Sequence, residues 1–356
     1  MIDDPPRFDV VRAEALAREL LGCSATAAAL PSERDQNFLL TIDGEPRFVL
    51  KIASANEDRA FLAAEQRAMQ HTAERCGLIP RIQTLRDGST LAQVTGPDGR
   101  AHLAWAVSAL PGVPLGTVRQ RSPGLFHELG AAVAELSRAL EGFDDPALHR
   151  DFHWDLAHGR AVIARHRALV TDAELGAAID ALVGKFDAHT APVLPALGRG
   201  VIHGDVNDYN VLVGGGADLF DRRQHVTGIL DFGDMVHGIT LGDLGIAIAY
   251  AMLDAPDPLS VMWQMVHGYH GVRAMTEPEL RAVFGLAALR LCMSACLAAY
   301  QQSRHPENAY LGVSQAPLRR TLPRLARIPF GIAAATARSA CGREPVASSA
   351  AVQAWL

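Results

Sequence analysis

Hydrophobic positions in the first 110 residues fall into short segments, most of them with the spacing of strands. Apolar residues recur at helical intervals from residue 8 to 21, and Gly22 follows as a stop signal. Two segments rich in branched and aromatic residues flank Asp43-Gly44, a dipeptide typical of tight hairpin turns. The expected elements are an opening helix at 8–21, strands at 37–42, 47–52, 89–95 and 102–110, and a helix at 56–76.

After Pro111-Gly112 the pattern changes to long stretches rich in alanine and leucine, which predict helices. A strand-rich segment at 200–232 interrupts them. A small β-rich lobe followed by a larger helical lobe predicts an α+β, two-lobed arrangement, with a ligand site in the cleft between the lobes. The expected helices span residues 123–141, 155–190, 240–254, 258–271 and 277–303.

This organisation divides the chain into three segments. Residues 1–110 would form the N-terminal lobe and residues 111–313 the C-terminal lobe. Residues 314–356 are dotted with arginine and then rich in alanine and serine, so we expect a tail or linker there.

Composition narrows the class of ligand. A formal net charge of -6 gives no basic excess for nucleic acid or an anionic membrane, so small molecules are the expected partners. The acidic, proline-containing start does not resemble a secretory signal, which predicts a cytoplasmic protein. Five scattered cysteines suggest neither a disulfide framework nor a zinc site, and Cys292 and Cys296 are expected to lie in the core. Nothing in the sequence indicates an oligomeric state.

The segment from Val201 to Val213 carries the strongest chemical signal. His203, Asp205 and Asn210 stand there in an H-x-D-x-x-x-x-N pattern, between apolar stretches that predict strands. Phosphoryl transfer needs a carboxylate that orients the attacking hydroxyl and oxygen ligands that hold Mg²⁺ against the phosphates. Asp205 suits the first task and Asn210 the second.

A second motif follows roughly twenty residues later, where an apolar stretch ends in Asp231-Phe-Gly233. A carboxylate in this position could bind the metal of a nucleotide. An aspartate after a strand is often only a turn residue. Two such motifs, close together and in this order, favour a phosphotransferase.

Two roles are possible for Lys51. Strand alternation puts it on the same face as Val49, where a lysine facing a cleft would grip α- and β-phosphates. A solvent-facing strand lysine is the alternative. A carboxylate from the following helix would fix its direction, and spacing alone does not choose among the candidates, which are Glu57, Asp58, Glu65 and Glu74.

The loop at residues 30–38 lies where a phosphate-covering loop would precede the hairpin. It contains no G-x-G-x-x-G pattern. Ser32 and backbone N–H groups would therefore have to contact the phosphates.

These motifs together resemble the aminoglycoside phosphotransferase and choline kinase-like superfamily, small-molecule relatives of protein kinases. The similarity runs over residues 8–304. It implies a protein-kinase-like two-lobed fold and a nucleotide donor, ATP or GTP, used with Mg²⁺. The roles that it implies are Asp205 as catalytic base, Asn210 and Asp231 as Mg²⁺ ligands, Lys51 and Glu65 as the ion pair that grips the phosphates, and backbone groups of Ser108 and Leu110 as contacts to the base of the nucleotide.

Within that superfamily, residues 30–38 and 231–234 resemble hydroxylysine kinases and the kinase domains fused ahead of class III aminotransferases, and residues 151–155 resemble the latter group. This resemblance implies a hydroxyl acceptor that bears an amine, such as an amino alcohol or a hydroxy-amino acid. Acidic side chains would suit a cationic amine. The candidates, each of which could equally be a cap or a surface residue, are Asp155, Asp208 and Asp234.

Two other hypotheses stay open. An antibiotic-inactivating phosphotransferase would share the catalytic loop and add a broad acidic pocket. A nucleotide-binding pseudokinase would use the fold as a scaffold, since a fold does not guarantee chemistry. The full set of Lys51, Asp205, Asn210 and Asp231 argues against the scaffold.

Overall fold

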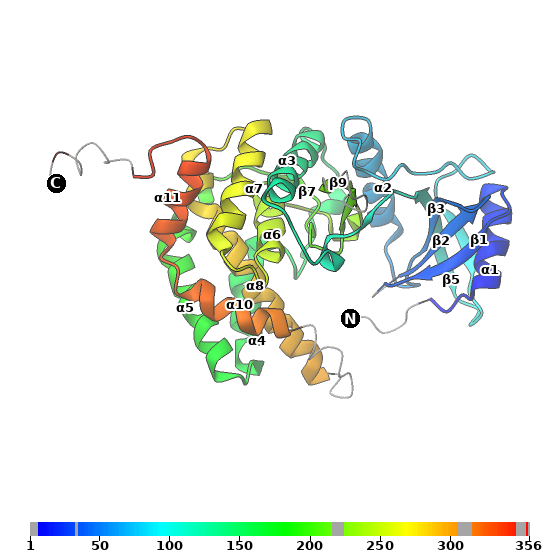
Figure 1. Ribbon diagram of the computed structural model, residues 1–356. Helices are drawn as coiled ribbons and strands as arrows, with labels where there is room; N and C mark the ends of the chain where they lie inside the picture. The colour runs from blue at the N-terminus through cyan, green and yellow to red at the C-terminus, as the bar shows by residue number, and fades with distance from the viewer. Residues whose placement is uncertain (1–5, 33–34, 216–223, 305–314, 347–353, 355–356) are drawn as a thin grey trace. The chain divides into compact units, whose positions relative to one another are not determined.

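The computed structural model describes residues 6–32, 35–215, 224–304, 315–346 and 354 (Figure 1). The chain divides into two compact units. Unit 1 comprises Met1–Pro111 and Gly228–Gly233, and unit 2 comprises Gly112–Thr227 and Asp234–Leu356. A short segment from the second half of the chain thus belongs to the first unit.

Unit 1 is built on an antiparallel sheet in the order β1-β2-β3-β5-β4. The helix α1 (Val10–Leu16) packs against β1 and β2 (Figure 1). It continues as a π-helical turn that ends at Gly22, whose φ of 71° is the left-handed stop that the sequence predicts. The other elements are β1 (Thr26–Leu30), β2 (Gln36–Ile42), β3 (Glu45–Ile52), α2 (Arg59–Ala73), β4 (Ala92–Thr95) and β5 (Ala101–Ser108).

The predicted hairpin is the centre of this sheet. Its turn residues Asp43 and Gly44 both have positive φ, 53° and 83°, which is the geometry that matches the twist of two paired strands. Leu50 and Ile52 on β3 are fully buried in the core of the unit. Strand alternation therefore turns Lys51, between them, to the opposite face.

Unit 2 is mostly helical and contains two small sheets, in the orders β6-β8-β9 and β10-β7. Its strands are β6 (Val113–Pro114), β7 (Arg199–Ile202), β8 (Val211–Gly215), β10 (Val236–Ile239) and the first four residues of β9 (Gln224–Ile229), whose last two residues belong to unit 1. Its helices of eight or more residues are α3 (Pro123–Leu140), α4 (Gly159–His166), α5 (Ala173–His189), α6 (Gly242–Ala251), α7 (Pro258–Val272), α8 (Glu277–Arg304), α10 (Ala316–Ala326) and α11 (Phe330–Ala340).

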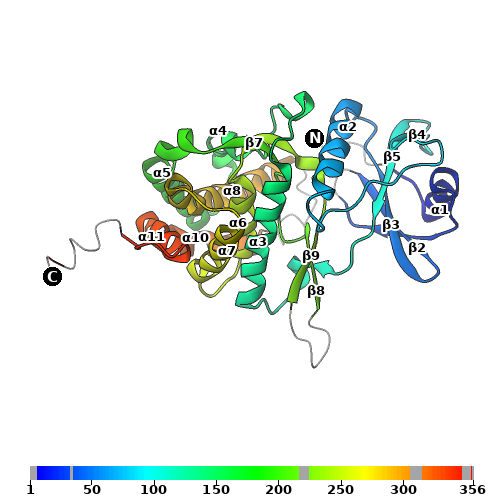
Figure 2. The ribbon, with the colours of Figure 1, turned by 90° about the horizontal axis from the view of Figure 1, so that it is seen from above.

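The long helix α8 is the core of unit 2, where it packs against α4, α5, α6, α10 and α11 (Figure 2). It is long and apolar enough to cross a membrane, but 89% of its most apolar stretch is buried inside the protein, as in a core helix. Cys292 and Cys296 are buried on it, as predicted. Burial raises the pKa of both thiols, so both stay protonated at neutral pH.

Two segments differ from their sequence-based expectation. The single helix expected at 155–190 is divided into α4 and α5, because Asp172 begins a new helix by accepting a hydrogen bond from the backbone N–H of Leu175. Residues 316–340, expected to be a tail, form α10 and α11, which pack against α5, α7 and α8.

Candidate active site

The loop between β7 and β8 is anchored by Asp243 on α6. The backbone N–H groups of His203 and Gly204 donate to the Asp243 carboxylate at 3.0 and 2.9 Å, and Asp243 is buried. Gly204 has a φ of 82°, and a Cβ there would lie 2.4 Å from the backbone oxygen of Asp234. The loop therefore needs glycine at this position, both for its conformation and for the close approach of a second segment.

The anchored loop presents the carboxylate of Asp205, held from two sides. Its Oδ2 accepts from the Nδ2 atoms of Asn207 at 2.7 Å and Asn210 at 2.9 Å, and its Oδ1 accepts from Arg290 Nη2 at 2.5 Å. Burial raises the pKa of Asp205, and the positive charge of Arg290 opposes that shift. The side chain is 18% exposed, so a fixed carboxylate still reaches solvent.

Arg290 is the residue of this candidate site that the sequence did not indicate. It comes from the buried middle of α8, where its Nη1 donates to the backbone oxygen of Trp154 at 3.2 Å. The guanidinium also lies 4.4 Å from the centre of the Trp154 ring and 5.8 Å from that of Tyr250. One signal could have found it: a single arginine inside the apolar run of a core helix needs a buried partner.

Asn210 and Asp234 lie close to this carboxylate. Asn210 uses its Nδ2 atom for Asp205, and its Oδ1 atom accepts no hydrogen bond from any residue that the structure describes. The negative charge of Asp234 raises the pKa of Asp205. The loop thus supplies a fixed carboxylate and an amide oxygen, and Asp234, from the segment after β9, adds a second acidic group nearby.

The other two acidic candidates have protein partners. Asp155 is 4% exposed, and its Oδ1 accepts from the backbone N–H of Ala157 at 2.9 Å, which caps the short helix Leu156–His158. Asp208 Oδ2 lies 3.4 Å from Arg121 Nη2, and both side chains are largely buried. The structure therefore supports a structural role for each.

In unit 1, Lys51 is one of only two lysines in the chain and is largely buried. Its Nζ lies 3.5 Å from Asp231 Oδ1 and 4.8 Å from the centre of the Trp105 ring. Burial opposes its charge, but the carboxylates of Asp231, Glu65 and Asp35 outweigh that effect and raise the pKa of Lys51. The lysine is therefore a fixed positive charge at neutral pH.

The expected ion pair between Lys51 and Glu65 differs from the arrangement found. Glu65 is buried on α2, its Oε1 has no hydrogen-bond partner among the described residues, and Lys51 pairs directly with Asp231 instead. Burial raises the pKa of Glu65 to about 7, so much of it is protonated at neutral pH. Asp58, another candidate partner, caps α2 through the backbone N–H of Ala60.

Asp231 follows β9 and has an unusual backbone. Its φ is 62°, in the left-handed region that residues with a Cβ seldom adopt, and its side chain is 54% exposed. Such conformations cluster at functional sites, where the surrounding structure holds them in place. The carboxylate is thereby turned to solvent beside Lys51.

The remaining expected contacts to the nucleotide also lie in unit 1. Ser32 follows β1 and is exposed. Ser108 ends β5, where its N–H donates to the backbone oxygen of Arg81 and its Oγ accepts from the Arg81 N–H. Leu110 is half-buried, and its N–H has no hydrogen-bond partner in the part of the chain that the structure describes. The backbone donor of Leu110, unlike that of Ser108, is thus left for a ligand.

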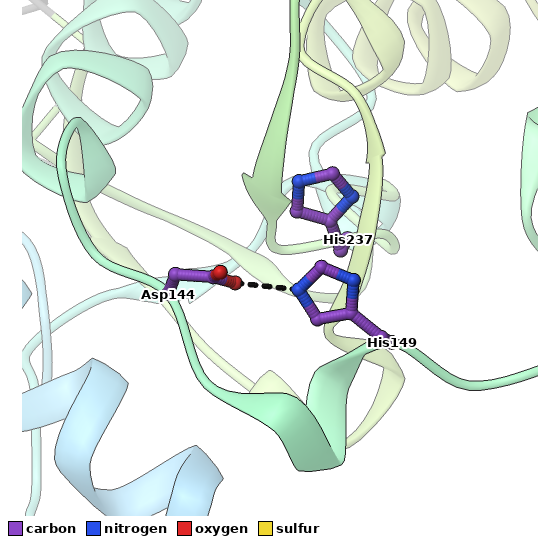
Figure 3. Close-up of side chains that lie close together, drawn as sticks. All are labelled: Asp144, His149 and His237. Carbon is purple, nitrogen blue, oxygen red and sulfur yellow. Dashed lines mark hydrogen bonds and ion pairs between the residues drawn. The ribbon is translucent and has the colours of Figure 1, made fainter.

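A separate cluster in unit 2 consists of Asp144, His149 and His237 (Figure 3). Asp144 Oδ1 lies 2.7 Å from His149 Nε2, which holds the pKa of Asp144 below its ordinary value. The two imidazole rings stack at 4.2 Å with planes 15° apart. Since ring nitrogens bind metals in the ring plane, parallel rings do not point at a common ion, and we interpret the cluster as a stacked histidine pair.

Comparison with known proteins places the chain in a family. The model of the phosphotransferase enzyme family matches residues 26–282, more than half of the sequence. The chain belongs to this family. Hydroxylysine kinase of Bos taurus is 29% identical over 321 residues, which cover 85% of each protein. Hydroxylysine kinase of Danio rerio is 27% identical and covers 87% of this chain and 89% of its own length.

Solved structures show the same fold. An amicoumacin kinase superposes with a TM-score of 0.65 at 14% identity, over 91% of this chain and 95% of its own. A microcompartment-associated aminopropanol kinase gives a TM-score of 0.61 at 16% identity, over 94% and 99%. These structures confirm the predicted kinase-like α+β fold, and the family match with its curated relatives confirms the predicted phosphotransferase activity.

Proposed function

We propose that this phosphotransferase moves the γ-phosphoryl group of ATP or GTP to a hydroxyl of an amine-bearing small molecule, of which 5-hydroxylysine is the leading candidate. The carboxylate of Asp205, fixed by two amides and Arg290 and still open to solvent, is the observation that carries the proposal. Relatives named hydroxylysine kinase along most of the chain support the acceptor class. The net charge of -6 is consistent with soluble small molecules as partners, rather than nucleic acid or membrane, and we propose a cytoplasmic location.

In this proposal Asp205 orients the acceptor hydroxyl and takes its proton as the new P–O bond forms. Lys51 contacts the phosphates of the donor. Backbone groups of Ser108 and Leu110 contact its base, with the N–H of Leu110 as the donor, since that of Ser108 bonds to the Arg81 oxygen. Asn210 and Asp231 would hold Mg²⁺, since an amide oxygen and an exposed carboxylate are the hard oxygen ligands that this ion prefers. Bound Mg²⁺ would neutralise charge on the phosphates.

The test of the function is nucleotide consumption with Mg²⁺ and either ATP or GTP across a panel of acceptors. We expect turnover with 5-hydroxylysine, weaker turnover with ethanolamine, and none above background without an acceptor. Turnover confined to an aminoglycoside would replace the acceptor class with an antibiotic. Nucleotide binding without turnover on any acceptor would favour the pseudokinase hypothesis.

The role of Lys51 can be measured by chemical labelling, because the chain has only one other lysine. An amine-selective reagent should label Lys51 about tenfold more slowly when the nucleotide is present at ten times its Kd, since nine-tenths of the protein is then occupied. Lys185 is the internal control. Its Nζ donates to the backbone oxygens of Ala326 and Ile328, and its labelling should not change. Equal protection of both lysines, or of neither, would contradict the assignment.

A further inference from the structure

A cavity of about 300 Å³ lies in unit 2 between the segment that follows α3 and the helix α4. Its volume suits a ligand the size of an amino acid. The lining combines one carboxylate, one guanidinium and two imidazoles with two small apolar side chains. The lining residues are Asp151, His153, His158, Ala161, Val162 and Arg165.

The two charged residues of this cavity have opposite signs, and neither has a charged partner among the residues that the structure describes. Asp151 and Arg165 are both exposed, and neither forms an ion pair or a hydrogen bond with any residue in the described ranges. This is unusual here, because the arginines nearest to Arg165 along the chain are paired: Arg160 with Asp187 at 2.7 Å, and Arg167 with Asp180 at 2.8 Å. A carboxylate and a guanidinium that face one cavity complement a zwitterion.

The cavity wall is tied to the proposed base. Phe152 is buried in a cluster with Ile202 and Val236, which holds the segment beside the strand that leads into the catalytic loop. The next residue but one, Trp154, accepts a hydrogen bond from Arg290 through its backbone oxygen, and Arg290 binds Asp205. The segment thus supplies Asp151 to the cavity and, through Trp154, a hydrogen-bond acceptor to the arginine that binds Asp205.

We propose that this cavity recognises the α-amino acid group of the acceptor, with Asp151 binding its ammonium and Arg165 its carboxylate. The inference rests on the proposed function and deepens it, because it selects hydroxy-amino acids over simple amino alcohols. Asp155 is buried and already accepts a hydrogen bond from the backbone of Ala157, so we assign the substrate amine to Asp151, four residues earlier in the chain.

The test compares KM values for 5-hydroxylysine and for 1-amino-2-propanol, which has the amine and hydroxyl but no carboxylate. Arg165→Met should raise KM for 5-hydroxylysine roughly tenfold, as expected for one charge-assisted contact, and change KM for 1-amino-2-propanol less than twofold. Asp151→Asn should raise both. In each case kcat should change little. The matched controls are Glu174→Gln and Arg319→Met, exposed charges on α5 and α10 outside the cavity.

Binding of L-lysine, which lacks the acceptor hydroxyl, separates this inference from the proposed function. Calorimetry should detect L-lysine with the wild-type chain and lose it in the Asp151→Asn/Arg165→Met variant, even if no acceptor is turned over. Cadaverine, which lacks the carboxylate, should bind more weakly than L-lysine. Turnover of 5-hydroxylysine with unchanged KM in both single variants, or equal binding of L-lysine to the wild type and the double variant, would overturn the assignment.

Discussion

Replacing Asp205 by asparagine should lower acceptor-dependent turnover by about 10²- to 10⁴-fold, the range that a positioned general base contributes. Asparagine fills nearly the same volume and keeps one oxygen for the amides of Asn207 and Asn210. It cannot take the proton of the acceptor hydroxyl. The Kd of the nucleotide should stay within about threefold of the wild-type value, because Lys51 and Asp231 are unchanged. Stopped-time assays of product and calorimetric titration with nucleotide measure the two quantities.

Asp187→Asn is the matched control, since this exposed carboxylate on α5 pairs with Arg160 on the surface. It should keep wild-type turnover. Retained activity in Asp205→Asn would refute the assignment of Asp205 as the base. If the wild-type chain binds nucleotide but turns over no acceptor, the result favours the pseudokinase hypothesis instead.

The parts of this protein that could be predicted are those whose cause is local in sequence. Two consecutive residues suited to positive φ, Asp43 and Gly44, define the hairpin turn. Because side chains alternate between the two faces of a strand, Lys51 points away from its buried neighbours Leu50 and Ile52. The spacing of Asp205 and Asn210 predicts that both lie in one short loop, and the structure adds that they form a hydrogen bond of 2.9 Å.

What could not be predicted depends on partners distant in sequence. The strand β1 is mostly alanine with little burial, so it shows no alternation, and it is a strand because it pairs along β2. Spacing likewise could not choose the partner of Lys51, because Asp231 reaches it from 180 positions away. The sequence did not show that the tail contains α10 and α11. Exposed arginines interrupt the buried positions of α10, and the alanine-rich sequence of α11 gives little contrast between its buried and exposed sides.

Arg290→Met should lower kcat by roughly 10²-fold, the usual cost of misplacing a reacting group by about 1 Å. Methionine fills much of the space in α8 but removes the donor to Asp205 Oδ1, and the carboxylate is then fixed only through Oδ2. The KM of the nucleotide should change little, because none of its proposed contacts involves Arg290. Steady-state kinetics give both values, and a thermal unfolding midpoint reports the loss of a buried charged partner.

The conservative variant Arg290→Lys separates positioning from packing. Lysine restores the positive charge beside Asp205 but lacks the planar guanidinium with its several N–H donors. It therefore cannot donate to Asp205 and to the backbone oxygen of Trp154 in the geometry that arginine uses. It should recover part of the kcat that methionine loses. If both variants lower the thermal midpoint equally and kcat falls in proportion to the folded fraction, Arg290 acts only on stability. If kcat of the folded protein follows the order Arg, Lys, Met, then Arg290, 85 positions beyond Asp205 and on a core helix, sets the direction of the Asp205 carboxylate.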